Sequence, residues 1–160
     1  MPPVLVESLP LIDPSHFLLL MLPEVATLCQ VILSLAAIKK LVFDEERISF
    51  FQLRQALQSN FMAPEGESIR RLSENAPKFG NDDDYVDSIT ADVFNLFARK
   101  VQKYRASRGG QLAPTSQTIT MNLKQGEVVG ATPDGRKAGE TVADNTSPAP
   151  GVDNAGPTAV

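Results

Sequence analysis

The chain has 160 residues, enough for one compact domain with a hydrophobic core. Apolar residues make up 42% of the sequence, which excludes wholesale disorder, and the formal net charge of -4 argues against a nucleic-acid-binding surface. Because Cys29 is the only cysteine and His16 the only histidine, an internal disulfide and a zinc site built from those ligands are both excluded.

The N-terminal residues lack the pattern of a targeting or membrane-spanning segment. The apolar run 17–22 is too short to cross a bilayer and is followed by Pro23 and Glu24. The first 16 residues contain no Lys or Arg, whereas a secretory signal begins with a basic region. Together with the single cysteine, this favours a cytoplasmic protein without a membrane partner.

The first predicted element is a helix over residues 24–43. Large apolar residues recur there every three or four positions and occupy all sides of the predicted helix. A helix of this kind needs burial rather than solvent. The charged residues 44–47 interrupt the pattern and end the element.

A second helix is predicted over residues 50–59. Ser49 followed by Gln52 forms a capping box, in which each residue satisfies a backbone N–H of the other. Ile48 and Leu53 are spaced to form the accompanying hydrophobic staple.

Two further helices follow. A short one is predicted over 67–74, and turn residues then indicate a loop at 75–81. The aspartates at 82–84 stand where a long helix begins, and acidic side chains there cap exposed backbone N–H groups. An apolar stripe carries this helix to about Arg105, and Gly109-Gly110 is expected to stop it.

The pattern changes after this helix. Polar and apolar residues alternate over 116–123, which predicts a strand buried on one face. Residues 132–160 contain few large apolar side chains, so this tail must lie on another surface to be ordered. Turns are predicted at Gly126, Gly130, Pro133 and Asp134-Gly135.

The residues whose side chains are able to react or bind a ligand are better explained by structural roles. His16 has no carboxylate at a useful spacing, and Cys29 stands in an apolar helix where a buried, unreactive thiol is expected. The acidic run 82–87 lacks the alternating ligands of a calcium loop, so helix capping explains it better. The turn at 134–137 has the composition to hold an anion, but a solvated turn is the more common case.

Several long strings resemble those of glycyl-radical enzymes of the pyruvate formate-lyase kind. KFGNDDDYVD at 78–87 is similar to the family's K-[YF]-G-N-D-D-D-Y-V-D string, and GATPDGRKAGE at 130–140 is similar to its G-A-x-P-D-G-R-K-A-G-E string. SLAAIKKLVF at 34–43 resembles a helix that precedes both in the family. Ser147-Pro148 and the residues at 156–160 fit the segment that follows them.

The resemblance covers residues 34–160, which we interpret as a partial pyruvate formate-lyase-like domain. Residues 1–33 do not match the Gly-rich stretch that precedes this region in the family, and the abrupt join suggests a truncated, frameshifted or misassembled reading frame. The resemblance implies an α/β fold: a segment of a ten-stranded α/β barrel, mostly helical, with one or two strands and a loop-rich C-terminal tail.

The family's chemistry, as the resemblance implies it, uses two loops that meet inside the barrel. One loop carries a catalytic cysteine in a G-C-x-E string and the other a radical glycine in an R-V-x-G-Y string. An S-adenosylmethionine iron–sulfur activase installs the glycyl radical in the intact enzyme. The cysteine loop belongs upstream of Ser34 and the glycine loop beyond Val160, so no residue here inherits a catalytic role, Cys29 included.

Two hypotheses follow. The first is an enzyme fragment, from a radical lyase or dehydratase cleaving C–C, C–O or C–N bonds or from a formate acetyltransferase-like enzyme, which binds no cofactor directly and is inactive alone. The second is a structural or binding piece that assembles with the remainder of the barrel or with a homo-oligomer partner. The residues at 147–160 look nearer to the dehydratase, decarboxylase and C–N or C–S lyase branches. The resemblance places Thr115, Gln117 and Ile119 in a stretch that approaches the substrate pocket in the family, where they either line the pocket or take part in ordinary barrel packing.

Overall fold

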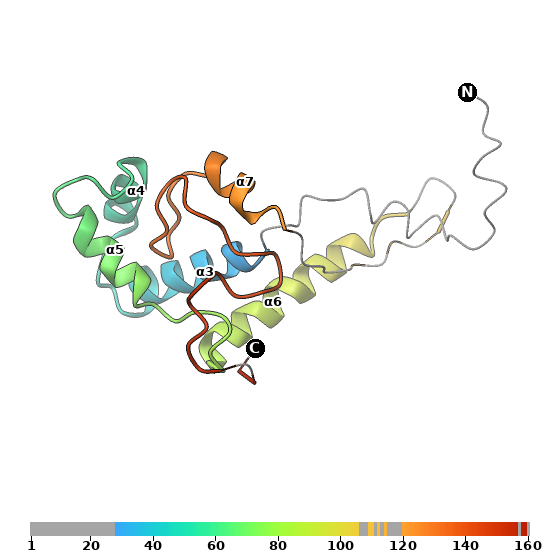
Figure 1. The fold of residues 1–160 in the computed structure, drawn as a ribbon. Coiled ribbons are helices and arrows are strands. Elements are labelled where there is room, and N and C mark those ends of the chain that lie inside the picture. Colours follow the sequence, from blue (N-terminus) through green and yellow to red (C-terminus); the bar gives the residue numbers. More distant parts are fainter. Residues whose placement is uncertain are drawn as a thin grey trace, which may run out of the picture.

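In a computed structural model, the described residues of the chain are 28–105, 109–110, 112, 114, 120–156 and 158–159. They form five α-helices and one π-helix in the order shown in Figure 1. The elements are α3 (Leu28–Ile38), η2 (Lys39–Asp44), α4 (Phe50–Gln58), α5 (Gly66–Glu74), α6 (Asp84–Val101) and α7 (Asn122–Val128).

Helix α3 lies between the C-terminal loops and α6 (Figure 1). One side packs against α6, where Ile32 and Ala36 share a fully buried cluster with Val86. The next side packs against the C-terminal loops, where Cys29 and Leu33 contact Ala143. The burial predicted for this apolar helix is therefore confirmed on two of its sides.

The predicted helix over 24–43 is helical throughout its described part, but its last turn is wider than an α-helical turn. η2 continues directly from α3, and the backbone N–H of Glu45 donates to the carbonyl of Lys40 five residues earlier at 2.9 Å. Lys39 Nζ also donates to Asp44 Oδ2 at 2.7 Å, across the same spacing of five residues. This ion pair therefore matches the i→i+5 geometry of the π-helix.

Helices α4 and α5 form a second core with the end of η2. Ser49 caps α4 through the predicted capping box with Gln52, so that prediction is confirmed. Ile48 and Leu53, the predicted staple, both belong to this core. Its buried members are Leu41, Ile48, Leu53, Ala56, Phe61 and Ile69.

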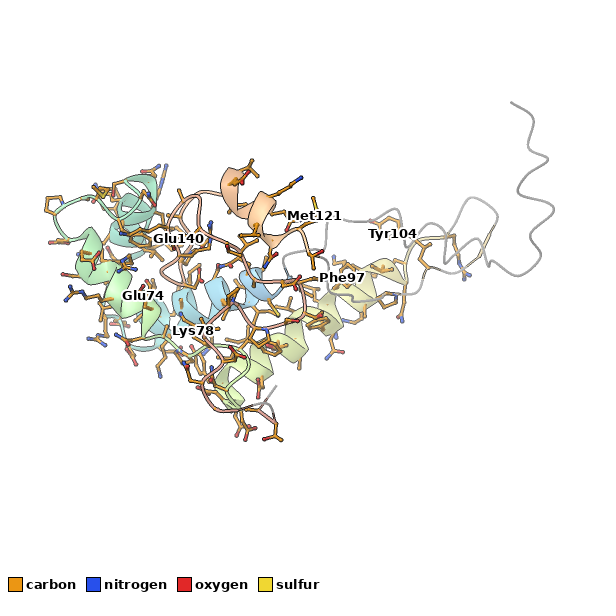
Figure 2. The ribbon with its side chains drawn as sticks, viewed as in Figure 1. Glu74, Lys78, Phe97, Tyr104, Met121 and Glu140 are labelled. Atoms are coloured by element: carbon orange, nitrogen blue, oxygen red, sulfur yellow. The ribbon has the colours of Figure 1, made fainter. Side chains whose placement is uncertain are left out.

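Helix α6 begins as predicted but ends at Val101, before the predicted end near Arg105. After the helix the backbone hydrogen bonds span three residues instead of four, since the N–H of Tyr104 donates to the carbonyl of Val101. Tyr104 is the last apolar residue of the predicted stripe, and its side chain is exposed at the far end of α6 (Figure 2). With that apolar side chain uncovered, packing does not extend the helix further.

The strand predicted over 116–123 is wrong at its C-terminal end. Residues 120–121 form a turn and Asn122 begins α7, while 116–119 lie outside the described residues. Gly126 is helical rather than part of a turn, which corrects a second prediction. A Cβ at Gly126 would lie 2.3 Å from the carbonyl oxygen of Glu140, so glycine here allows α7 to pack directly on the backbone of the tail.

The described residues are mostly helical, as predicted, and contain no strand element. The described part of the tail, residues 132–156 and 158–159, lies against this chain's own α3 and the loop before α6. It contributes a set of buried residues: Asp134, Arg136, Val142, Ala143 and Asn145. The surface that this apolar-poor tail needs is therefore supplied within the chain.

Candidate functional site

The two motif strings meet at a buried polar network centred on Gln30 of α3. The Gln30 side-chain amide donates to Asp134 Oδ1 at 2.8 Å and to Thr132 Oγ1 at 3.2 Å. Its oxygen accepts the backbone N–H of Ala143 at 3.1 Å. Sequence reasoning missed this residue; the available signal was a single amide in an otherwise apolar helix, since a buried amide needs partners.

Lys78, from the first string, ties the loop before α6 to the second string. Its ammonium donates to the carbonyl of Ser73 at 2.7 Å and to the carbonyl of Asp134 at 3.0 Å. Burial lowers the pKa of Lys78, and the negative charges of Asp134 and Glu74 oppose that effect. Lys78, Glu74 and Glu140 are labelled in Figure 2, where α5 and the C-terminal loops meet.

Arg136, from the second string, holds that string in its folded shape. Its guanidinium donates to the backbone carbonyls of Lys137 and Glu140 at 2.9 and 2.5 Å, and to Thr132 Oγ1 at 3.2 Å. It also donates to the carbonyls of Val129 and Gly130. Burial lowers the pKa of Arg136, against the opposing charges of Asp134 and Glu140.

The turn at 134–137 is therefore not the solvated turn that the sequence favoured. Asp134 and Arg136 are both buried, because they face the network rather than water. The donors of Arg136 are occupied by carbonyls of its own string and of Val129, which directly precedes it. This turn therefore has a structural role and is not an anion site.

Asn81, also from the first string, fixes the end of the tail. Its amide nitrogen donates to the carbonyl of Val152 at 2.8 Å. Its oxygen accepts the N–H groups of Asn154 and Ala155 at 2.7 and 3.1 Å. Gly80, next to it, has φ of +93°, and a Cβ there would lie 2.4 Å from the Pro148 ring. The loop before α6 thus receives the tail at close range.

The acidic run caps α6, as predicted. Asp83 is the N-cap residue, and its Oδ1 accepts the N–H of Tyr85 at 3.0 Å. Burial and the neighbouring aspartates raise the pKa of Asp87. Tyr85 in turn donates its hydroxyl to Asp44 Oδ2 at 2.7 Å, and the ammonium of Lys39 lies 4.5 Å from its ring centre. These contacts fasten the start of α6 to η2.

Cys29 is fully buried, and burial raises the pKa of its thiol to about 12. The structural interpretation of this cysteine is confirmed, because a thiol held in that state is a poor nucleophile. His16 and the predicted pocket residues Thr115, Gln117 and Ile119 lie outside the described residues.

Within the described part of the chain, no group of three or more His, Cys, Asp or Glu side chains is placed to hold a metal ion. Over the same residues, no helix is both long and apolar enough to span a bilayer. Where the two strings meet, donors and acceptors are largely used up in holding loops together. The arrangement is suited to fixing backbone rather than to reacting with a substrate.

Comparisons with known proteins agree with this architecture. A family model described as pyruvate formate lyase-like matches residues 16–126. The protein "Probable dehydratase YbiW" of Escherichia coli strain K12 is 42% identical over an alignment of 134 positions, which covers 79% of this chain and 16% of that protein. Other relatives are named as isethionate sulfite-lyases.

Two solved structures share the fold. The glycerol-bound B12-independent glycerol dehydratase of Clostridium butyricum matches with a TM-score of 0.76 and 42% identity, over 83% of this chain and 17% of that chain. A glycyl radical enzyme of Archaeoglobus fulgidus matches with a TM-score of 0.76 and 33% identity, over 84% and 17%. The fold is that of a segment of these enzymes' barrels, and the chain belongs to the pyruvate formate lyase-like family.

Proposed function

We propose that this chain forms part of the barrel wall of a glycyl-radical dehydratase or lyase, and that it carries out no radical chemistry alone. The supporting observation is that Gln30 holds the second family string on α3 while Lys78 of the first string donates to the carbonyl of Asp134. The chain in which the two strings fold together spans 16% of the length of its dehydratase relative. Radical chemistry requires a cysteine loop and a glycine loop enclosed together, and these residues supply only part of the enclosing wall.

The proposed reaction class is dehydration or cleavage of a C–C, C–N or C–S bond rather than formate transfer. The residues at 147–160 favour these branches, and relatives named as dehydratases, sulfite-lyases and an indoleacetate decarboxylase support the same choice. In the intact enzyme an S-adenosylmethionine activase would install the glycyl radical. Thr115, Gln117 and Ile119 are proposed to line the substrate pocket, and the cytoplasm is the proposed compartment.

A second candidate function is that of a binding piece, which assembles with a partner supplying the rest of the barrel. It is favoured by the large apolar side chains that remain exposed on separate elements. Phe51 on α4 and Leu123 on α7 are examples, at 65% and 68% exposure. Exposed apolar surface of this kind is typical of sites that another chain covers.

Electron paramagnetic resonance tests the first proposal. The purified chain is treated anaerobically with a glycyl-radical activase, S-adenosylmethionine and a reductant, beside a full-length glycyl-radical dehydratase as positive control. We expect a glycyl radical signal from the control and none from this chain. A radical signal, or any substrate turnover, from the chain alone would overturn the proposal.

Size-exclusion chromatography tests the second candidate. The chain is mixed with a separately produced chain that contains the remaining segments of a family barrel. If the two chains assemble, they are expected to elute together at a larger size than either chain alone. Separate elution of the two folded chains would contradict the binding role.

A further inference from the structure

One side of α3 remains apolar and uncovered. Val31 and Leu35 lie one helical turn apart, so they occupy the same side, and they are 45% and 41% exposed. Ser34 borders this side, and its hydroxyl donates to the carbonyl of Gln30 at 2.7 Å. The polar residue at the border is therefore satisfied within the helix. We call Val31 and Leu35 the α3 stripe.

The α3 stripe differs in composition from the exposed sides of α5 and α6. The sequence of α3, LCQVILSLAAI, contains no charged residue. By contrast, α5 exposes Glu67 and Arg71, and α6 exposes Asp92 and Arg99. A helix that faces solvent normally carries charges on that side, whereas one that is apolar all round is normally buried. The other two sides of α3 are already buried against α6 and the C-terminal loops (Figure 1).

We propose that the α3 stripe is a docking surface for the remainder of a glycyl-radical enzyme barrel, an inference that rests on the proposed function. The occupant follows from the lengths of the chains. The same fold in the solved glycerol dehydratase accounts for 17% of that chain, so most of its residues lie outside the matched segment. An apolar stripe on a helix buried on its other sides is the surface that additional barrel elements would cover.

The first arm of the test uses the full chain alone. Leu35→Lys places a charge on the α3 stripe, Leu35→Met keeps it apolar, and Ser68→Lys adds the same charge on the exposed, already charged side of α5. Circular dichroism and the urea midpoint are expected to be the same for all three variants and the parent chain, because Leu35 packs in none of the buried clusters.

The second arm uses an intact barrel. Residues 28–159, with or without each substitution, replace the matching segment of the Clostridium butyricum glycerol dehydratase. In this chimera Leu35→Lys is expected to lower the melting temperature by about 2 °C, because docking would bury an unpaired charge. The Leu35→Met and Ser68→Lys chimeras are expected to have the same melting temperature as the parent chimera.

Two outcomes would overturn the inference. If the Leu35→Lys chimera and the parent chimera have the same melting temperature, the α3 stripe faces solvent in the intact barrel. If sedimentation shows that the chain alone forms a dimer which Leu35→Lys dissociates, the occupant is a second copy. The melting shift needs no radical, so a chimera that gives no radical signal can still support the docking surface.

Discussion

At Gly135 the backbone has φ of +101°, a conformation that L side chains rarely adopt. A Cβ at this position would lie 2.7 Å from Glu74 Cγ, 3.0 Å from the backbone nitrogen of Glu74 and 3.1 Å from the carbonyl oxygen of Arg70. The glutamate side chain has room to move, but the backbone atoms of α5 do not. The second string therefore approaches α5 as closely as a glycine permits.

Gly135→Ala is predicted to destabilise the chain more than Gly139→Ala. Gly139 also has a positive φ, of +84°, but a Cβ there would meet nothing within 4 Å. Both variants carry the backbone cost, and only Gly135→Ala adds the steric one, which we expect to be roughly 1–3 kcal/mol. Urea unfolding of both variants measures the difference, and equal midpoints would contradict the close approach at Gly135.

Lys78 gives the network a pH dependence. Burial lowers the pKa of Lys78 below its ordinary value of 10.5, with Asp134 and Glu74 opposing the effect. Between the folded pKa and 10.5 the unfolded chain binds more protons than the folded one, so this residue makes the free energy of unfolding rise with pH across that window. Lys78→Met removes that contribution.

We therefore expect the parent chain to gain stability relative to Lys78→Met as the pH rises from neutral towards 10.5. Urea unfolding across this range measures the gap between them. Lys100→Met, at an exposed position of α6, removes a lysine without touching the network and serves as the control. A gap that stays constant with pH would show that the ammonium of Lys78 is not desolvated.

At the scale of elements, α4 shows how local contacts define a helix. The hydroxyl of Ser49 accepts the N–H of Gln52 at 3.2 Å, and the Gln52 side chain accepts the N–H of Ser49 at 2.9 Å. Both partners lie within four positions in the sequence, so the start of α4 was predictable from the sequence alone.

Ser49→Ala is predicted to cost about 1 kcal/mol, because it leaves the N–H of Gln52 without its capping partner. Ser68→Ala makes the same change at an exposed position in the first turn of α5, where Ser68 is not the capping residue, and should be nearly neutral. Thermal unfolding followed by circular dichroism compares the two. Equal melting temperatures would show that the cap adds nothing to the stability of α4.

Helix α7 illustrates the opposite case. The alternating pattern over 116–123 predicted a strand, yet Asn122 begins a helix. The backbone carbonyl of Asn122 accepts the N–H of Val142 at 3.4 Å. Gly126 then packs against the backbone at Glu140, in a segment distant in sequence. Propensity in a short segment is a weak prior, and here contacts with the tail override it.

At the scale of the whole molecule, the core is divided. The α4–α5 core is a separate buried cluster from the two that flank α3. Large apolar residues remain exposed on several elements, Phe50 and Val128 among them. Small separate clusters give weaker coupling between parts of a chain than one continuous core does.

We predict that the isolated chain aggregates or unfolds with low cooperativity. Calorimetry is expected to give a broad transition, with a van't Hoff enthalpy below the calorimetric enthalpy, because the α4–α5 core can open before the α3–α6 core. A sharp two-state transition from a monomer would contradict this. Sedimentation in the same buffer provides the check on oligomeric state.

Local sequence accounts for the start of α4, the bounds of α5, the cap of α6 and the burial of Cys29, because each depends on residues a few positions apart or on one apolar stretch. The family strings likewise indicated the barrel origin without coordinates. What required the tertiary structure is how the strings are used: Gln30 and Asp134 are separated by 104 positions, and no local pattern pairs them. Burial of the tail, α7 and the uncovered side of α3 depend in the same way on long-range packing, which decides where polar groups find partners and which apolar faces remain open.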